Sequence, residues 1–232
     1  MKYLDILFLI PARRDSKGLP DKNIKKLKGK PLIEYTIDFA KKNQNAKDII
    51  CVTTNDCRIK KIIDIYKRVD LIDRPENLSQ DTTSMEEVIN HCIEYYEKRN
   101  FFFNSIILLQ PTSPLRKKID FLNLKSSYNE TVDMVVSVKK SKENPYYLLY
   151  EENKDGFLKK SKELNISRRQ DAPNVYCLNG SFFMFNINSI KNKSIQDFTK
   201  IIKVEMPAER SIDVDDEMDW KFLKFLIKNK VI

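Results

Sequence analysis

The chain has 232 residues, 41% of them hydrophobic and 32% charged, and its 42 basic and 33 acidic side chains give a formal net charge of +9. This length suits one sizeable domain with its own core, and no apolar run reaches the length of a membrane helix, so membrane insertion is not expected. Four scattered cysteines and a single histidine argue against a disulfide framework and a Cys/His zinc site.

The N-terminal apolar stretch "YLDILFLI" superficially resembles the core of a secretory signal. Asp5 interrupts it, however, and no small-residue cleavage site follows. We therefore predict a buried first strand and a cytoplasmic protein.

Short apolar runs rich in β-branched residues alternate with longer amphipathic segments. The runs lack strict alternation, as expected of strands that are covered on both faces. Predicted strands are 6–10, 48–54, 105–110, 133–138, 181–187 and 200–206. Predicted helices are 31–43, 57–68, 83–99, 118–129 and 215–229. This alternation predicts an α/β fold with a mostly parallel, Rossmann-like sheet.

The regular rhythm breaks after residue 139, where the chain becomes rich in charged and turn residues. We interpret 140–180 as an insertion with short strands and as a probable dimerisation arm. No linker separates independent domains, so residues 1–232 are predicted to form a single domain that carries this insertion.

The loop "IPARRDSKGLPDKN" (10–23) follows the first predicted strand and carries four cations, Arg13, Arg14, Lys17 and Lys22. Such charges repel one another unless solvent or an anion screens them. In an α/β sheet this loop faces the ligand crevice, and its backbone N–H groups and cations suit a polyphosphate. The loop lacks both the Walker A and the GxGxxG pattern, so a solvated turn remains an alternative.

Asp213 and Asp215 lie two residues apart in "SIDVDD", so in an extended segment both side chains point to one face. Paired carboxylates repel, and Mg²⁺ shared with substrate phosphates would relieve that repulsion. The residues by themselves favour a simpler role, in which Asp215 or Asp216 is the N-cap of the next helix. His91 sits beside Cys92 in a predicted helix, and we expect it to be structural rather than a catalytic base.

Five motifs occur in a fixed order over nearly the whole chain. They are "ARRDSKGLPDKN" (12–23), "RPENLSQDTTS" (74–84), "LLQPTSPLR" (108–116), "RRQDAPNVYCLNGSFF" (168–183) and "ERSIDVDDEMDW" (209–220). This set resembles the CMP-N-acylneuraminate synthetases, the cytidylyltransferases that activate nine-carbon α-keto sugar acids. The resemblance implies a fold of the nucleotide-diphospho-sugar transferase type, a homodimer with swapped arms, and Mg²⁺-dependent reaction of CTP with the sugar acid to give the CMP-sugar and pyrophosphate.

The same resemblance implies roles for individual residues. Arg13, Lys17 and Lys22 match positions that hold the CTP phosphates, and Asp213 and Asp215 match the magnesium site, so the catalytic set is Arg13, Lys22, Asp213 and Asp215. The remaining nucleotide-binding residues are Ala12, Asn23, Arg74, Asp81 and Ser84. The sugar-binding residues are Gln110, Arg169, Asn179, Phe182 and Phe183. Two alternatives stay open, a surface ion pair of Arg74 with Glu76 or Asp73 and a core position for the two phenylalanines.

Three departures from the family pattern, Asn55, Tyr147 and Cys177, leave the sugar uncertain, so legionaminate, another nonulosonate and the eight-carbon acid Kdo are alternatives to N-acylneuraminate. The 168–183 segment favours the nine-carbon group. A different class, a basic nucleic-acid-binding module, is suggested by the net charge and by "NFFFN" (100–104). The lysines are dispersed and these phenylalanines precede an apolar strand, so no nucleic-acid partner is expected.

Overall fold

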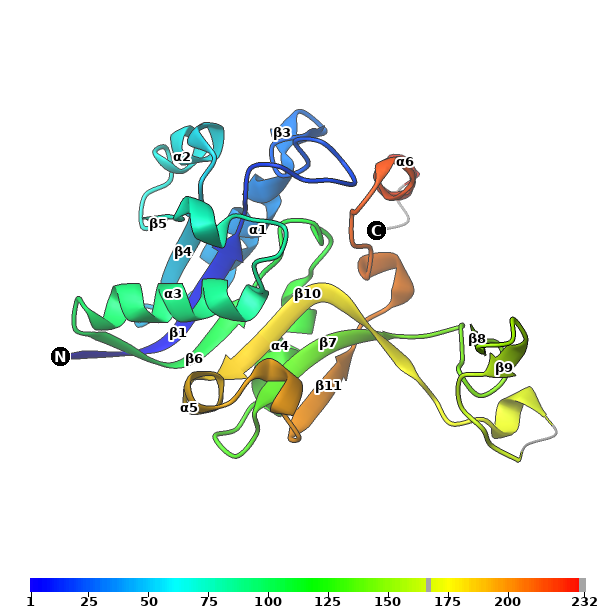
Figure 1. Ribbon diagram of the computed structural model, residues 1–232. Coiled ribbons are helices and arrows are strands. Elements are labelled where there is room, and N and C mark those ends of the chain that lie inside the picture. The colour runs from blue at the N-terminus through cyan, green and yellow to red at the C-terminus, as the bar shows by residue number, and fades with distance from the viewer. Residues whose placement is uncertain (166–167, 230–232) are drawn as a thin grey trace.

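The computed structural model describes residues 1–165 and 168–229. Its centre is a seven-stranded sheet in the order β11-β7-β10-β6-β1-β4-β5 (Figure 1). All neighbouring strands are parallel except β10, which is antiparallel to both β6 and β7. The strands are β1 (Lys2–Pro11), β4 (Ile49–Thr54), β5 (Asp70–Asp73), β6 (Phe101–Leu108), β7 (Met134–Lys140), β10 (Tyr176–Asn186) and β11 (Ile201–Glu205). The predicted mostly parallel α/β sheet is confirmed.

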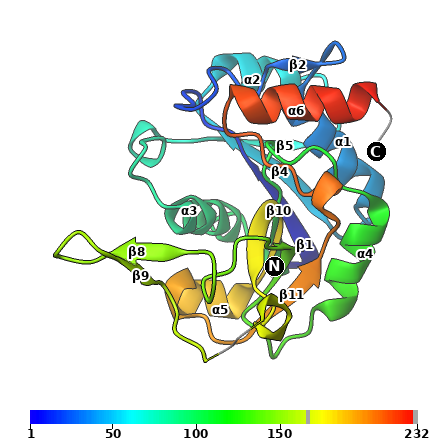
Figure 2. The ribbon, with the colours of Figure 1, turned by 90° about the vertical axis from the view of Figure 1, so that its right-hand side faces the viewer.

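Helices cover both faces of this sheet (Figure 2). One face packs against α1 (Leu32–Asn43), α2 (Cys57–Ile63) and α4 (Lys118–Ser127), and the other against α3 (Met85–Glu97) and α5 (Ile187–Asn192). β1 shows the reason, because Phe8 and Ile10 enter one core cluster whereas Leu7 and Leu9 enter the other. A strand buried on both faces needs apolar residues at every position, which is the unbroken run seen in the sequence.

The last helix, α6 (Glu217–Lys228), packs on neither main face. Its buried side chains Trp220 and Leu223 join Leu19 and Leu27 in a third cluster, which includes residues of the loop after β1. The C-terminal helix is thereby attached to the N-terminal loop. A small hairpin, β2 (Lys26–Leu27) with β3 (Lys30–Pro31), completes this corner.

The structure differs from the predicted elements at several places. β1 and β6 begin four residues earlier than predicted, so Phe101–Phe103, predicted to precede a strand, lie within β6. The helix predicted over 57–68 ends at Ile63, because the chain turns at Arg68, with φ of 63°, to enter β5. β5 was not predicted, since it is an edge strand in which only Ile72 is buried. β10 begins at Tyr176 rather than at 181, and its pairing with β7 shifts register between Leu178 and Phe183.

Residues 140–180 leave the body of the molecule along extended ends of β7 and β10 (Figure 1). They carry a two-stranded hairpin, β8 (Tyr150–Glu152) with β9 (Leu158–Lys160), whose residues are all exposed. Residues 166–167 of the predicted insertion lie outside the described part. Exposed apolar side chains of this arm are Leu148, Leu149, Tyr150, Phe157, Leu158, Leu164 and Leu178. Among the described residues, no helix has the length and apolar character to cross a bilayer.

Phe182 occupies a core position and not the wall of a sugar pocket. It is fully buried, and its ring meets Phe39 of α1 with centroids 5.6 Å apart. The structure corrects the sugar-binding assignment of this residue, because β10 directs the side chain into the helix-covered face of the sheet.

We expect Phe182→Ala to lower the free energy of unfolding by about 3–5 kcal/mol, since it leaves a cavity in a packed core. Phe225→Ala is the matched control, because Phe225 is 56% exposed on α6, and it should change stability by less than about 0.5 kcal/mol. Urea denaturation monitored by circular dichroism measures both. An unaltered unfolding midpoint for Phe182→Ala would contradict the core assignment.

Candidate active site

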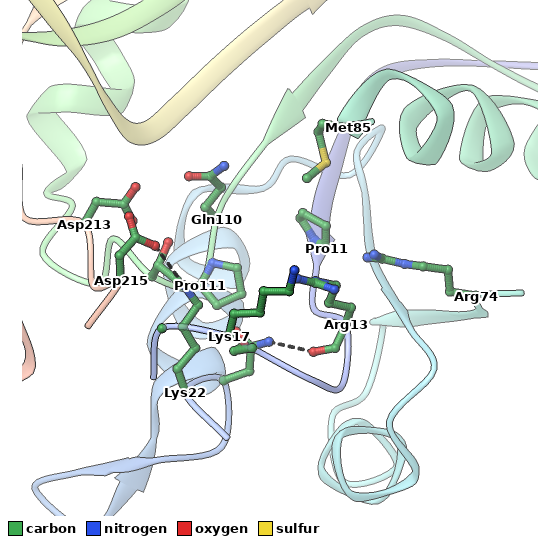
Figure 3. A pocket seen from close by; sticks show the side chains of 14 residues that line it. Pro11, Arg13, Lys17, Lys22, Arg74, Met85, Gln110, Pro111, Asp213 and Asp215 are labelled. Atoms are coloured by element: carbon green, nitrogen blue, oxygen red, sulfur yellow. Dashed lines mark hydrogen bonds and ion pairs between the residues drawn. The ribbon is translucent and has the colours of Figure 1, made fainter. Parts of the chain in front are cut away.

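A cavity of about 490 Å³ opens at the carboxyl ends of β1, β5 and β6 (Figure 3). In an open α/β sheet this is where ligands bind. The cavity brings three of the four loop cations, Arg13, Lys17 and Lys22, into one site with the acid pair Asp213 and Asp215. It is lined by Pro11, Arg13, Ser16, Lys17, Gly18, Lys22, Asn23, Arg74, Met85, Gln110, Pro111, Thr112, Asp213 and Asp215.

The two ends of the chain are joined inside this cavity by direct contacts. Lys22 Nζ donates to Asp215 Oδ1 at 2.9 Å and to the carbonyl oxygen of Val214 at 3.2 Å. Gly18 packs so closely that a Cβ there would overlap the backbone carbonyl oxygen of Asp215. The close contact between the loop and the segment of Asp215 therefore depends on a glycine at position 18.

The N-cap of α6 is Asp216, whose side chain accepts from the backbone N–H groups of Met218 and Asp219. Asp213 and Asp215 are not used as the cap, and both line the cavity. Burial raises the pKa of Asp213 above its usual range, and the nearby Asp215 charge acts in the same direction. Asp215 pairs with Lys22, whereas Asp213 has no ion pair among the described contacts, so a cation bound at Asp213 would be favoured.

The donor set fits magnesium. Among the described residues, no group of three His, Cys, Asp or Glu side chains is placed to hold a metal ion, so the protein provides no complete cage. Mg²⁺ is commonly bound through one or two carboxylates, with substrate phosphates and water completing the octahedron. Asp213 and Asp215 supply two carboxylates beside cations suited to phosphate.

Arg74 is the buried cation of the cavity. It is only 5% exposed, and it donates to the carbonyl oxygen of Thr53 at 2.9 Å and to Thr53 Oγ1 at 3.4 Å. Burial lowers its pKa to about 10. The surface ion pair considered as an alternative is absent from the described contacts, because Asp73 pairs with Lys60 and Glu76 accepts from Asn55. In Figure 3 the guanidinium points toward Pro11 and Met85, across the cavity.

Asp81 pairs with two cations of the N-terminal loop. Its carboxylate lies 2.5 Å from Arg13 Nη2 and 2.7 Å from Lys17 Nζ. Hydrogen bonds from Lys17 and Arg13 hold the pKa of Asp81 below its usual range, so the pairs persist throughout neutral pH. Asp81 itself does not line the cavity. Its carboxylate pairs with Arg13 and Lys17, the cations that the sequence resemblance assigns to the CTP phosphates.

The remaining nucleotide-binding predictions have structural positions. Ala12 is buried, and its N–H donates to the carbonyl oxygen of Thr53 at 3.0 Å. Ser84 caps α3 in a capping box with Glu87. Neither lines the cavity, although Asn23 does, and its amide donates to the carbonyl oxygen of Arg13 at 3.1 Å.

The predicted sugar-binding residues are not brought together within one chain. Gln110 lines the cavity, whereas Arg169 lies in the arm, where its Nε donates to Tyr147 Oη at 2.9 Å. Asn179 is 3% exposed and does not line the cavity. Phe183 is half-buried and stacks on Phe185 with ring centroids 6.3 Å apart. The assignment of Asn179 is corrected to a structural position, because its side chain is buried and bonded within the protein. That of Phe183 stays a prediction.

Met85 and Thr112 line the cavity and were missed by sequence reasoning. Thr112 sits inside the quoted "QPTSPLR" motif, which offered a signal, whereas an apolar Met85 at a helix start offered none. His91 was expected to be structural, and it does not line the cavity; burial lowers its pKa.

We expect Asp81→Asn to tighten CTP binding severalfold in the absence of sugar, because the triphosphate no longer competes with a carboxylate for Arg13 and Lys17. Asp15→Asn is the control, since it removes the same charge from a fully exposed residue of the same loop. Titration calorimetry at low salt measures both affinities. Weaker binding by Asp81→Asn alone would show that this carboxylate contacts the nucleotide.

Comparison with known proteins agrees with this geometry. The cytidylyltransferase family pattern matches residues 7–215. The CMP-N,N'-diacetyllegionaminic acid synthase of Legionella pneumophila is 31% identical over 225 residues, covering 96% of each chain. The N-acylneuraminate cytidylyltransferase of Streptococcus agalactiae serotype III is 31% identical over 215 residues, covering 91% of this chain and 51% of its own length.

Among solved structures, CMP:2-keto-3-deoxy-manno-octonic acid synthetase complexed with CTP superposes with a TM-score of 0.70. The two sequences are 16% identical, and the match covers 97% of this chain and 99% of the other, so it establishes the shared fold. The family match over most of the sequence establishes more than the fold. The chain belongs to the cytidylyltransferase family and is a nucleotidyltransferase.

Proposed function

We propose that this enzyme transfers CMP from CTP to the anomeric hydroxyl of a nine-carbon nonulosonic acid, with Mg²⁺ as cofactor. The observation that carries the proposal is that Arg13, Lys17 and Lys22 share one cavity with Asp213 and Asp215. Cations alone would suit many anions. Cations facing paired carboxylates suit a polyphosphate that arrives with a divalent metal ion.

The triphosphate is assigned to the N-terminal loop. Arg13 offers a planar fork for phosphate oxygens, and Lys17 and Lys22 offer point charges. In the absence of nucleotide these groups bind Asp81 and Asp215. Binding of the triphosphate exchanges internal carboxylates for phosphate oxygens, so little uncompensated charge is created.

The cytosine base is assigned to Arg74. The buried guanidinium has two of its nitrogens held by Thr53, which fixes the plane in which the other donors project. Cytosine presents acceptors at O2 and N3, whereas uracil carries a hydrogen at N3. A donor that cannot lose its proton at neutral pH therefore favours cytosine over uracil.

The reaction itself requires the anomeric hydroxyl to attack the α-phosphorus in line with departing pyrophosphate. Asp213 and Asp215 would hold Mg²⁺, which when bound offsets charge on the phosphoryl oxygens. Arg13 and Lys22 neutralise the pyrophosphate leaving group, and Gln110, which lies beside Asp213, orients the acceptor (Figure 3). Catalysis then rests on positioning and charge stabilisation rather than on covalent chemistry.

The acceptor is proposed to be an N-acylneuraminate-type acid, with legionaminate as the nearest alternative. Similarity to a legionaminic acid synthase over 96% of each chain supports legionaminate. Similarity to an N-acylneuraminate cytidylyltransferase, over about half of that relative's length, supports N-acylneuraminate. Both acids have a carboxylate and an N-acyl group. A cytoplasmic location is proposed as well, supported by four free thiols.

We also propose a homodimer formed through the arm at 140–180. The hairpin β8–β9 has no core of its own, and it exposes a set of apolar side chains that includes Phe157 and Leu158. An isolated hairpin of this kind is marginally stable, and a second copy would cover it. Swapped arms would also bring Arg169 to the sugar side of the partner's cavity, where its guanidinium suits the substrate carboxylate.

We expect pyrophosphate release only when CTP, Mg²⁺ and a nonulosonic acid are all present, in a panel of N-acetylneuraminic acid, N,N'-diacetyllegionaminic acid and Kdo. Asp215→Asn should lower turnover by about 10²–10³-fold, the range for loss of a group that stabilises developing charge. Asp216→Asn is the matched control, since asparagine is an equally good N-cap. Equal losses in the two variants, or release with no member of the panel, would refute the proposal.

For the arm, we expect a dimer by light scattering coupled to gel filtration. Phe157→Asp with Leu158→Asp should yield monomers that still bind CTP but have lost most kcat/KM for the sugar acid. Leu122→Asp, on the exposed side of α4, controls for added surface charge. A variant that remains dimeric, or a wild-type chain that is monomeric at micromolar concentration, rules out this interface.

A further inference from the structure

Three chain segments meet on the side of the cavity where Gln110 and Asp213 lie. They are the turn 110–116 after β6, the irregular stretch 179–182 of β10, and the segment 211–214. At their centre is Gly180, with φ of 70°. A Cβ there would lie 2.5 Å from Asp213 Oδ2 and 2.6 Å from Gln110 Oε1. The polar ends of Asp213 and Gln110 thus rest against the same glycine, so the Gly180 backbone determines their separation.

Asn179 fixes the backbone on the N-terminal side of Gly180. Its Nδ2 donates to Ser211 Oγ at 2.9 Å, and its Oδ1 accepts from Ser137 Oγ at 2.6 Å and from Ser181 N at 3.2 Å. The amide is buried, and both of its heavy atoms are engaged within the protein. Asn179 therefore ties the segment that carries Asp213 to β7 and β10, and it is not available to a substrate.

Arg116 fixes the backbone on the C-terminal side of Gly180. Its Nε donates to the carbonyl oxygen of Ser181 at 2.7 Å, its Nη2 donates to the carbonyl oxygen of Gln110, and its Nη1 donates to Thr36 Oγ1 at 3.1 Å. The residue is 7% exposed, and burial lowers its pKa to about 9. None of its hydrogen bonds reaches a carboxylate. A buried charge without an ion pair carries a large desolvation free energy, and an apolar side chain would fill the same space without that penalty.

That cost indicates a role beyond packing. Only a guanidinium can reach two carbonyl groups on different segments with a fixed angle between its donors. The two carbonyls belong to Gln110 itself and to Ser181, the neighbour of Gly180. The third bond, to Thr36, leads away from the cavity into α1.

We propose that Arg116 and Asn179 are positioning residues that act through Gly180 to set the separation of Gln110 from Asp213, and so place the acceptor hydroxyl relative to the α-phosphate. This inference rests on the proposed function and assigns neither residue a contact with substrate. Arg116 fixes the acceptor side, and Asn179 fixes the segment of the acid pair. No described side-chain hydrogen bond of Arg116 or Asn179 reaches the loop at 10–23, whose Lys22 touches this region at Val214 and Asp215.

The test compares Arg116→Lys and Ser211→Ala with the control Thr36→Val. Lysine keeps the charge but loses the fork, and Ser211→Ala removes the acceptor of the Asn179 amide without altering a cavity residue. We expect kcat to fall by about 10–100-fold in Arg116→Lys, the range known for groups that support the residues of a metal site without touching the substrate, and less in Ser211→Ala. KM for CTP and CTP binding without sugar should stay within about twofold of wild type. Thr36→Val should retain wild-type kinetics.

A double-mutant cycle supplies the second readout. If Arg116 acts through Gln110, the losses caused by Arg116→Lys and Gln110→Ala are not additive. Additive losses, full activity in Arg116→Lys, or an equal loss in Thr36→Val would each overturn the inference. Should the wild-type chain release no pyrophosphate with any acid, the proposed function fails by itself. Crystal structures of Arg116→Lys and Thr36→Val then test the positioning role without any activity measurement. An unchanged separation of Gln110 from Asp213 in Arg116→Lys overturns that role.

Discussion

The contact between Lys22 and the Asp215 segment is the interaction on which the site depends. It joins a cation from the first loop to a carboxylate from the last segment, and the close approach of Gly18 to the same backbone leaves no room between them. Neither partner alone makes a nucleotide site. The cations without the acids would hold any anion, and the acids without the cations would repel a triphosphate.

The third core cluster explains how this contact is maintained. Leu19 follows Gly18 in the loop, and Trp220 and Leu223 belong to α6, so apolar packing holds together the same segments that carry opposite charges. Exposed ion pairs contribute little stability by themselves. Burial of these side chains supplies the larger free energy and leaves the charged groups free to exchange partners when nucleotide binds.

The charges of the site are also compensated within the chain. Asp81 binds Arg13 and Lys17, and Asp215 binds Lys22, so each of the three loop cations that line the cavity has an internal partner. Arg74 and Arg116 differ, because both are buried and donate only to neutral acceptors in the described contacts. The loop cations are exposed or half-buried and suit exchange with phosphate, whereas the buried arginines suit fixed orientation.

The sequence by itself determined the alternating strands and helices, the cation-rich loop after the first strand, and the acid pair, because each is a local pattern of charge or hydrophobicity. It could not determine orientation. Whether Phe182 faces a pocket or a core depends on the register of β10, and that register shifts within the strand. The meeting of Gln110, Gly180 and Asp213 is a contact between distant segments, so only the tertiary structure decided it. The cap bonds of Asp216 are local, but Asp215, the other candidate, is bound by Lys22 of the distant N-terminal loop.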